Sequence, residues 1–151
     1  TDSYYDSQLV LVVKKGSKYE KATSLADFAG AKVTAQLNTF HYSVIDQIPG
    51  VDKQAAMDNF PAMRVALQAG TIDAYVSELP EAISAQAANS DFVMVKLTDG
   101  FKASPEDTQT AVGVKKDSPL TKEINEALKT ISSEERQKIM EEAIKNQPAA
   151  E

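Results

Sequence analysis

The sequence predicts an α/β fold: an open, largely parallel sheet with helices on both faces, followed by two C-terminal helices. The main observation is alternation, because strand-like runs rich in β-branched residues take turns with helical patterns between residues 8 and 97. Such alternation is typical of a sheet whose strands are joined by covering helices. After residues 109–116 the pattern becomes purely helical.

Apolar runs bounded by turn residues predict the strands. The predicted strands are 8–15, 31–36, 54–60 (the weakest), 71–78, 91–97 and 109–116. The first and last of these share one pattern, an apolar run that ends in a Lys pair. They bracket residues 16–108, which we interpret as one lobe. The two bracketing strands then cross into and out of that lobe.

Capping signals predict the helices. Ser24 with Asp27 opens a short helix that Gly30 ends. Pro61 opens a helix that Gly70 ends, with an apolar stripe of Ala62, Val65, Ala66 and Ala69. The other predicted helices are 39–48, 80–89, 119–131 and 135–146, the last opened by a capping box at Ser132–Glu135. Residues 98–108 are predicted to be a connector and Pro148–Glu151 a frayed tail.

Composition excludes several classes of function. The 151 residues carry a net charge of -6, which argues against binding nucleic acid or anionic membranes. The absence of cysteine removes disulfides, thiol catalysis and thiolate zinc sites. No run of about 18 apolar residues occurs, so no transmembrane helix is predicted. We expect no cofactor and no metal site, because the acidic residues lack ligand spacing and there is a single histidine.

No catalytic motif stands out. His41, the only histidine, falls inside the predicted helix 39–48, and no hydrolase, zinc-protease or dinucleotide-binding motif occurs. We therefore expect His41 on the helix surface or at the rim of a cleft rather than in a catalytic role. Tyr4 and Tyr5 are open to two interpretations, since they can stack on a ligand or simply pack.

Two junctions between a strand and a helix are candidates for a binding site. The first is Gln36–Thr39, where the N–H groups of a starting helix can bind an anion. The second is Ser77–Pro80, which places Glu78 at the end of a strand expected to be central. Each junction alone is interpreted more simply as a helix cap. If the two strands are parallel neighbours, however, Thr39 and Glu78 face one cleft, and together they suit the carboxylate and the ammonium of a zwitterion.

Several stretches, taken in order, resemble a known family. They are "TDSYYDSQLVLVVKKGS", "GAKVTAQLNTFHY", "ALQAGTIDAYVSELPEA" and "TAVGVKKDSPLTKEINEALKTI". Together they resemble the type 2 periplasmic-type solute-binding proteins of polar amino-acid ABC transporters (family 3 extracellular solute-binding proteins). The nearest likeness is to Gram-positive binders of basic or polar amino acids. The resemblance covers nearly the whole chain.

The resemblance implies roles for four residues. Thr39 matches the threonine of the family's Q-x-G-T motif, which contacts the α-carboxylate of the ligand through its backbone and hydroxyl. Asn38 stands where that motif has glycine, and Phe40 follows at a position that shapes the pocket. Glu78 matches the acidic partner of the α-ammonium group, which is an aspartate in most members. Catalytic and metal-binding residues are not expected.

The resemblance also implies an organisation into two lobes. Residues 1–15 would be the end of lobe 1 with the first hinge strand, 16–108 would be lobe 2, and 109–151 would be the second hinge strand with the C-terminal helices of lobe 1. Most of lobe 1 would then be missing, as in a truncated protein or a C-terminal fragment. The apolar stripes of the last two helices would be left uncovered. Either the helices fold back onto their own lobe or they dock on a second copy, and we favour a homodimer or a domain swap.

The function implied is the amino-acid-binding component of an ABC importer, or a fragment of one, and not an enzyme. The expected ligands are polar or basic amino acids such as arginine, lysine, glutamine or histidine, and the expected protein partner is the transporter permease. The expected location is extracellular or periplasmic, as a lipoprotein or otherwise tethered to the membrane. The alternatives are an enzyme or an effector-sensing domain on the same fold.

Overall fold

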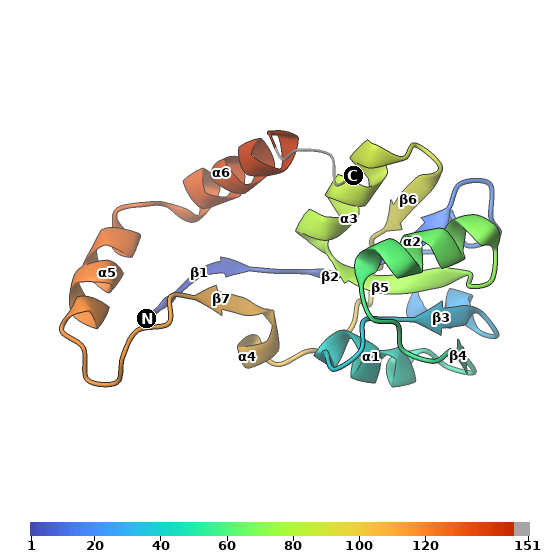
Figure 1. Ribbon diagram of the computed structural model, residues 1–151, viewed down its shortest axis with the longest axis horizontal. Helices are drawn as coiled ribbons and strands as arrows, with labels where there is room; N and C mark the ends of the chain where they lie inside the picture. Colours follow the sequence, from blue (N-terminus) through green and yellow to red (C-terminus); the bar gives the residue numbers. More distant parts are fainter. Residues whose placement is uncertain (147–151) are drawn as a thin grey trace. The chain divides into compact units, whose positions relative to one another are not determined.

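The computed structural model describes residues 1–146, so the predicted frayed tail at Pro148–Glu151 lies outside the described residues. The chain divides into two compact units. The larger unit is Gln8–Ala103 and holds a five-stranded sheet with its helices. The smaller unit combines Thr1–Ser7 with the segment from Ser104 onward and holds a two-stranded sheet and two long helices (Figure 1).

The sheet of the larger unit has the strand order β4-β3-β5-β2-β6. β3 pairs in parallel with both β4 and β5, whereas β2 pairs antiparallel with both β5 and β6. Four strands therefore run in one direction and β2 runs against them, which confirms a largely parallel sheet. The strands are β2 (Leu9–Lys14), β3 (Lys32–Thr34), β4 (Asp52–Lys53), β5 (Ala74–Glu78) and β6 (Phe92–Val95).

Helices cover both faces of this sheet, as predicted. One face packs on the 3₁₀ helix η1 (Leu25–Phe28), α1 (Phe40–Val44) and the 3₁₀ helix η2 (Ile45–Gln47). The other packs on α2 (Phe60–Ala69) and α3 (Leu79–Ala88). Successive side chains of β5 point to opposite faces of the sheet, so Val76 packs in the apolar cluster on the first face and Tyr75 in the cluster on the second.

The caps of α2 confirm the sequence signals, but its buried face does not. Gly70 ends the helix with a φ of 74°, in the left-handed region that favours glycine. The buried residues are Met63, Ala66 and Leu67, whereas Val65 is 70% exposed. The predicted stripe was therefore wrong apart from Ala66, because the larger side chains of Met63 and Leu67 define the apolar face of this helix.

Two predicted strands are shorter than expected. In place of 54–60 the chain forms β4 at Asp52–Lys53, and then only an isolated bridge between Gln36 and Met57. Strand pairing stops there because Asn59 caps α2, its Oδ1 accepting from the Ala62 N–H at 2.9 Å.

The predicted strand 109–116 ends early, as β7 (Gln109–Ala111). It pairs antiparallel with β1 (Ser3–Asp6), a short strand that the sequence analysis did not predict.

The smaller unit also contains α4 (Pro105–Thr108), α5 (Leu120–Lys129) and α6 (Ser133–Lys145). The four-residue α4 lies within the predicted connector. Neither α5 nor α6 has a buried residue, and Leu120 and Ile139 are 51% and 58% exposed. The capping box of α6 is confirmed, with the Ser132 N–H donating to the Glu135 carboxylate at 2.9 Å. Within residues 1–146, no helix is long and apolar enough to cross a membrane.

Candidate functional site

The two predicted junctions lie at the same edge of the larger unit's sheet. β3 and β5 are parallel neighbours, with Val33 opposite Ala74 and Thr34 opposite Tyr75. The chain leaves β3 through Gln36–Thr39 and leaves β5 at Glu78, so both segments follow the carboxyl ends of adjacent strands. The geometric condition for one shared site is therefore met. Ligands of open α/β sheets bind at such edges.

The first junction has an unusual backbone. Asn38 has a φ of 60°, in the left-handed region, where asparagine is one of the few residues tolerated besides glycine. Asparagine thus adopts a backbone conformation for which glycine is the usual residue. Thr39 occupies the N-cap position of α1 without a side-chain capping bond, and its Oγ1 donates instead to the Gln36 carbonyl at 2.7 Å. Phe40 begins α1 and is half-buried against the core.

The second junction places Glu78 at the N-cap position of α3, again without a side-chain capping bond. Its Oε1 lies 3.0 Å from Nε2 of His41, which reaches it from α1. The Glu78 side chain remains 35% exposed. Thr39 and Glu78 thus occupy N-cap positions, but neither makes a side-chain capping bond.

His41 does not lie on a helix surface as expected. It is only 6% exposed, and its ring meets that of Phe40 at a centroid distance of 4.5 Å, tilted by 59°. The sequence indicated a helix here but not which of its faces was buried. The pairing of His41 with Glu78, 37 residues later, requires β3 and β5 to be neighbours. Sequence reasoning named Glu78 but missed this partner.

A second polar cluster, also missed, lies on the opposite face of the sheet. Arg64 of α2 contacts Oε1 of Glu81 in α3 through Nη2 at 2.6 Å and Nε at 3.2 Å. The buried Ser77 hydroxyl donates to the other oxygen of Glu81. Burial, and then the negative charge of Glu81, raise the pKa of the Tyr75 hydroxyl far above its usual range. This cluster links α2, α3 and β5 and is mostly shielded from water, which favours a structural role.

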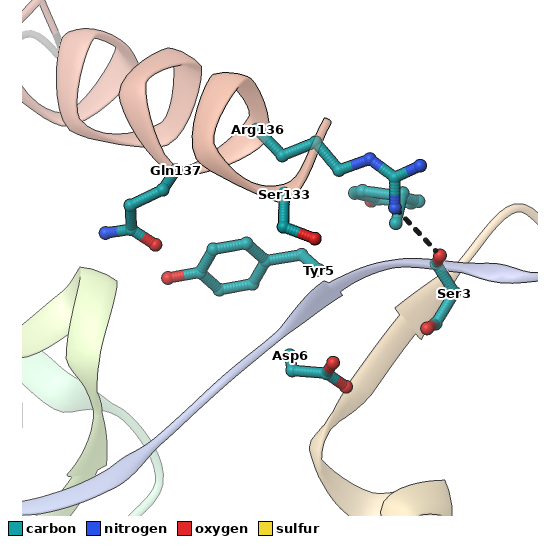
Figure 2. Close-up of a pocket in the computed structure, with 7 residues that line it drawn as sticks. Ser3, Tyr5, Asp6, Ser133, Arg136 and Gln137 are labelled. Atoms are coloured by element: carbon teal, nitrogen blue, oxygen red, sulfur yellow. Dashed lines mark hydrogen bonds between the residues drawn. The ribbon is translucent and has the colours of Figure 1, made fainter. Parts of the chain in front are cut away.

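The smaller unit contains a cavity of about 190 Å³ between β1 and α6. Figure 2 shows the Tyr5 ring beside α6, near Ser133 and Gln137. Arg136 donates from Nη1 to the Ser3 carbonyl at 3.2 Å and from Nη2 to the Leu128 carbonyl. The guanidinium therefore ties β1 to the end of α5 and the start of α6. Tyr4 also lines the cavity.

Residues 1–146 contain no cluster of three or more histidine or acidic side chains that could hold a metal ion. The partly exposed carboxylate of Glu78 can bind the ammonium group of a small zwitterion. The Thr39 hydroxyl can bind its carboxylate group once it turns from the Gln36 carbonyl.

Comparison with known proteins finds relatives only among solved structures. No family model matches the sequence, and no curated protein matches it. Among solved structures, the amino acid ABC transporter substrate-binding protein AbpA from Streptococcus pneumoniae, bound to L-arginine, is 27% identical. The match covers 96% of this chain and 60% of that chain, with a TM-score of 0.73.

Two further structures extend the comparison. A mutant of ArgBP from T. maritima is 26% identical over 97% of this chain and 61% of that chain, with a TM-score of 0.70. The GluR0 ligand-binding core in complex with L-glutamate is 17% identical over 96% of this chain and 61% of that chain, with a TM-score of 0.73, and it shows a shared fold alone. The chain thus spans about 60% of the length of the structures it matches.

Among the solved structures that this chain resembles are substrate-binding proteins of amino acid ABC transporters. More particularly, the resemblance to the type 2 periplasmic-type solute-binding proteins of amino-acid ABC transporters is confirmed, and the larger unit has the architecture of one lobe of that fold.

Proposed function

We propose that this chain serves as an extracytoplasmic amino-acid-binding component of an ABC importer, or as part of one. The observation that carries the proposal is the pair of adjacent parallel strands whose carboxyl ends position Thr39 and Glu78. The structural neighbours, which are amino acid ABC transporter substrate-binding proteins, support it.

In the proposed binding mode Thr39 contacts the α-carboxylate of the ligand and Glu78 its α-ammonium group. Charge-assisted hydrogen bonds at both ends are strong and directional, so they select free amino acids over peptides or amines. Asn38 gives the loop its left-handed turn, and the half-buried Phe40 contributes an apolar wall.

L-Arginine is the first ligand to test, because AbpA is bound to it. Lysine, glutamine and histidine follow as other polar or basic candidates. The proposed protein partner is the transporter permease, and the proposed location is the outer side of the membrane, with the protein tethered to it.

Titration with the twenty common amino acids, followed by amide chemical shifts, tests this function. We expect millimolar binding or none by the 151-residue chain alone, because exposed ion pairs are worth less than about 1 kcal/mol. A version extended to the length of its structural neighbours should bind far more tightly. Micromolar binding by the chain alone would show that one lobe suffices or that a second chain completes the site. Failure of every amino acid with both versions would contradict the function.

Glu78→Gln identifies the ammonium contact. In the extended version it should weaken binding about ten- to hundredfold, or about 1.5–3 kcal/mol, because it removes a charge-assisted bond. Asp58→Asn is the matched control: Asp58 is exposed, follows the bridge to Gln36 and loses the same charge. A dissociation constant unchanged by Glu78→Gln would exclude a ligand contact.

We further propose that a second copy of the chain covers the apolar stripes of α5 and α6, by docking or by a swap. Leu120, Ile124, Leu128, Ile139 and Ile144 belong to these helices, which bury no side chain. Burying a large aliphatic side chain contributes about 1.5–3 kcal/mol. Light scattering should show a mass that rises with concentration. A strictly monomeric mass, with both helices protected from hydrogen exchange, would instead indicate that they fold back on their own chain.

A further inference from the structure

We propose that His41 is a positioning residue of this site, which holds the Glu78 carboxylate in place for the ammonium group of the amino acid. The inference rests on the proposed function and adds to it a residue that the family motifs did not indicate. His41 itself need not touch the ligand.

The first step of the argument is geometric. A glutamate side chain has several rotatable bonds, and fixing a mobile side chain costs entropy when a ligand binds. Glu78 is 35% exposed, but its Oε1 lies 3.0 Å from an imidazole that is itself buried. The ring of His41 is held by burial and by its contact with Phe40. A fixed donor thus restrains one oxygen of the Glu78 carboxylate.

The second step concerns the proton on the imidazole. Nδ1 of His41 is buried and has no hydrogen-bond partner among residues 1–146. A proton on Nδ1 would therefore be a buried donor without an acceptor, and Nε2 would turn a lone pair toward a carboxylate oxygen. The tautomer with the proton on Nε2 avoids both problems. In this tautomer His41 donates to Glu78, and the pair keeps the negative charge that an ammonium ion requires.

The third step links the two ends of the site. Thr39, Phe40 and His41 are consecutive, so α1 carries the proposed carboxylate contact and, through His41, also orients the proposed ammonium contact. The distance between the two contacts is then set by one short helix and its neighbouring strand. We infer that His41 contributes to affinity for the zwitterion through Glu78 rather than through the stability of the fold.

Two amide variants separate these possibilities. Gln can place its Nε2 near that of histidine and keep the donor, whereas the shorter Asn reaches only the level of Nδ1. In the extended version, with L-arginine as the probe and amide chemical shifts as the readout, His41→Asn should raise the dissociation constant about three- to tenfold and His41→Gln less than about twofold. Ser43→Ala, an exposed position on the same helix, is the control and should change nothing.

A double-mutant cycle with Glu78→Gln provides the decisive comparison. If His41 acts through Glu78, His41→Asn should have no further effect on binding once Glu78 is replaced. A loss of equal size in both backgrounds would indicate a general structural role and overturn the proposal. Thermal melts of each variant identify any loss of binding that comes from unfolding. If His41→Gln and His41→Asn are destabilised equally, the difference between their dissociation constants still tests the proposal.

Nitrogen-15 spectra of the imidazole give a readout that does not depend on binding. We expect the proton on Nε2, and a proton on Nδ1 with Nε2 bare would overturn the proposal. If neither the 151-residue chain nor the extended version binds any amino acid in its wild-type form, the proposed function fails and this inference fails with it. If the wild type binds and His41→Asn binds equally well, only the inference fails.

Discussion

The larger unit buries apolar side chains, whereas the smaller unit leaves its own at least partly exposed. Within the described part of the chain, every buried apolar side chain belongs to Gln8–Ala103, where two clusters fill the two faces of one sheet. The helices α5 and α6 of the smaller unit have apolar residues at helical spacing but bury none of them. Amphipathic sequence is thus present in both units, but only the larger one supplies the surface that such a sequence packs against.

This difference also bears on function. The candidate site lies wholly in the larger unit, at the ends of β3 and β5, where the packed sheet fixes the backbone that carries Thr39 and Glu78. Sites built on well-packed elements are held in place more accurately than sites on loosely packed ones. The smaller unit instead presents apolar helices, which suit contacts with another protein surface.

Truncation of an apolar side chain should lower the free energy of unfolding much more in the larger unit than in the smaller one. Phe28 is fully buried and stacks on Tyr19 at a centroid distance of 5.1 Å. Phe28→Ala should lower the free energy of unfolding by about 3–5 kcal/mol, through lost burial and a cavity. Leu128→Ala in α5 should cost less than about 1 kcal/mol in the monomer, because Leu128 is not buried. Urea unfolding of dilute protein measures both, and equal losses would show that α5 is as well packed as the core.

The sequence predicted best those features that local chemistry determines. Gly70 and Ser132 mark helix ends through contacts with residues a few positions away, and the alternation of strands and helices indicated the sheet. Pairings between distant segments were not predictable in this way. The ribbon of β1 and β7 joins residues more than 100 positions apart, and its two strands are only four and three residues long.

The candidate site shows the same division. Its residues were found from strand ends and from family motifs, so Asn38, Thr39, Phe40 and Glu78 were all named. The bond between His41 and Glu78 depends on which face of a five-residue helix is buried, and five residues are too few for a periodic pattern. The ion pair of Arg64 and Glu81 depends on the packing of α2 against α3. Nothing in the sequence pattern around Arg64 indicated it.

Backbone strain gives a second, smaller contrast between the units. Asn38 in the larger unit and Asp117 in the smaller one both have positive φ, at 60° and 62°. Asn38→Ala should destabilise the larger unit by about 1 kcal/mol, because a Cβ without a polar group disfavours this conformation, whereas Asn38→Gly should be nearly neutral. Asp117→Ala should leave the main urea transition unchanged. A shift of that transition by Asp117→Ala would mean that both units unfold together.

The smallest expected effect concerns acid and the two capping boxes, one in each unit. Hydrogen bonds from the backbone N–H groups of Thr23 and Ser24 lower the pKa of Asp27, and one from the Ser132 N–H lowers the pKa of Glu135. A carboxyl with a lowered pKa in the folded state stabilises that state above its usual pKa, and the contribution is lost as the pH falls through the lowered value. Both capping boxes should therefore weaken only below the usual carboxyl pKa values of 3.8 and 4.5.

The consequences of losing the cap should differ between the two units. The helix η1 keeps Leu25 and Phe28 in the core when its cap is lost, whereas α6 has no buried side chain to hold its first turn. The protection factors of the amides at the start of α6, which correct for the intrinsic pH dependence of exchange, should thus fall in acid while those in η1 change little. Glu135→Gln retains an oxygen that can accept the capping bond but does not titrate, so it should remove the pH dependence at α6 alone. A loss of protection in acid that persists at α6 in this variant would assign the effect to another carboxyl.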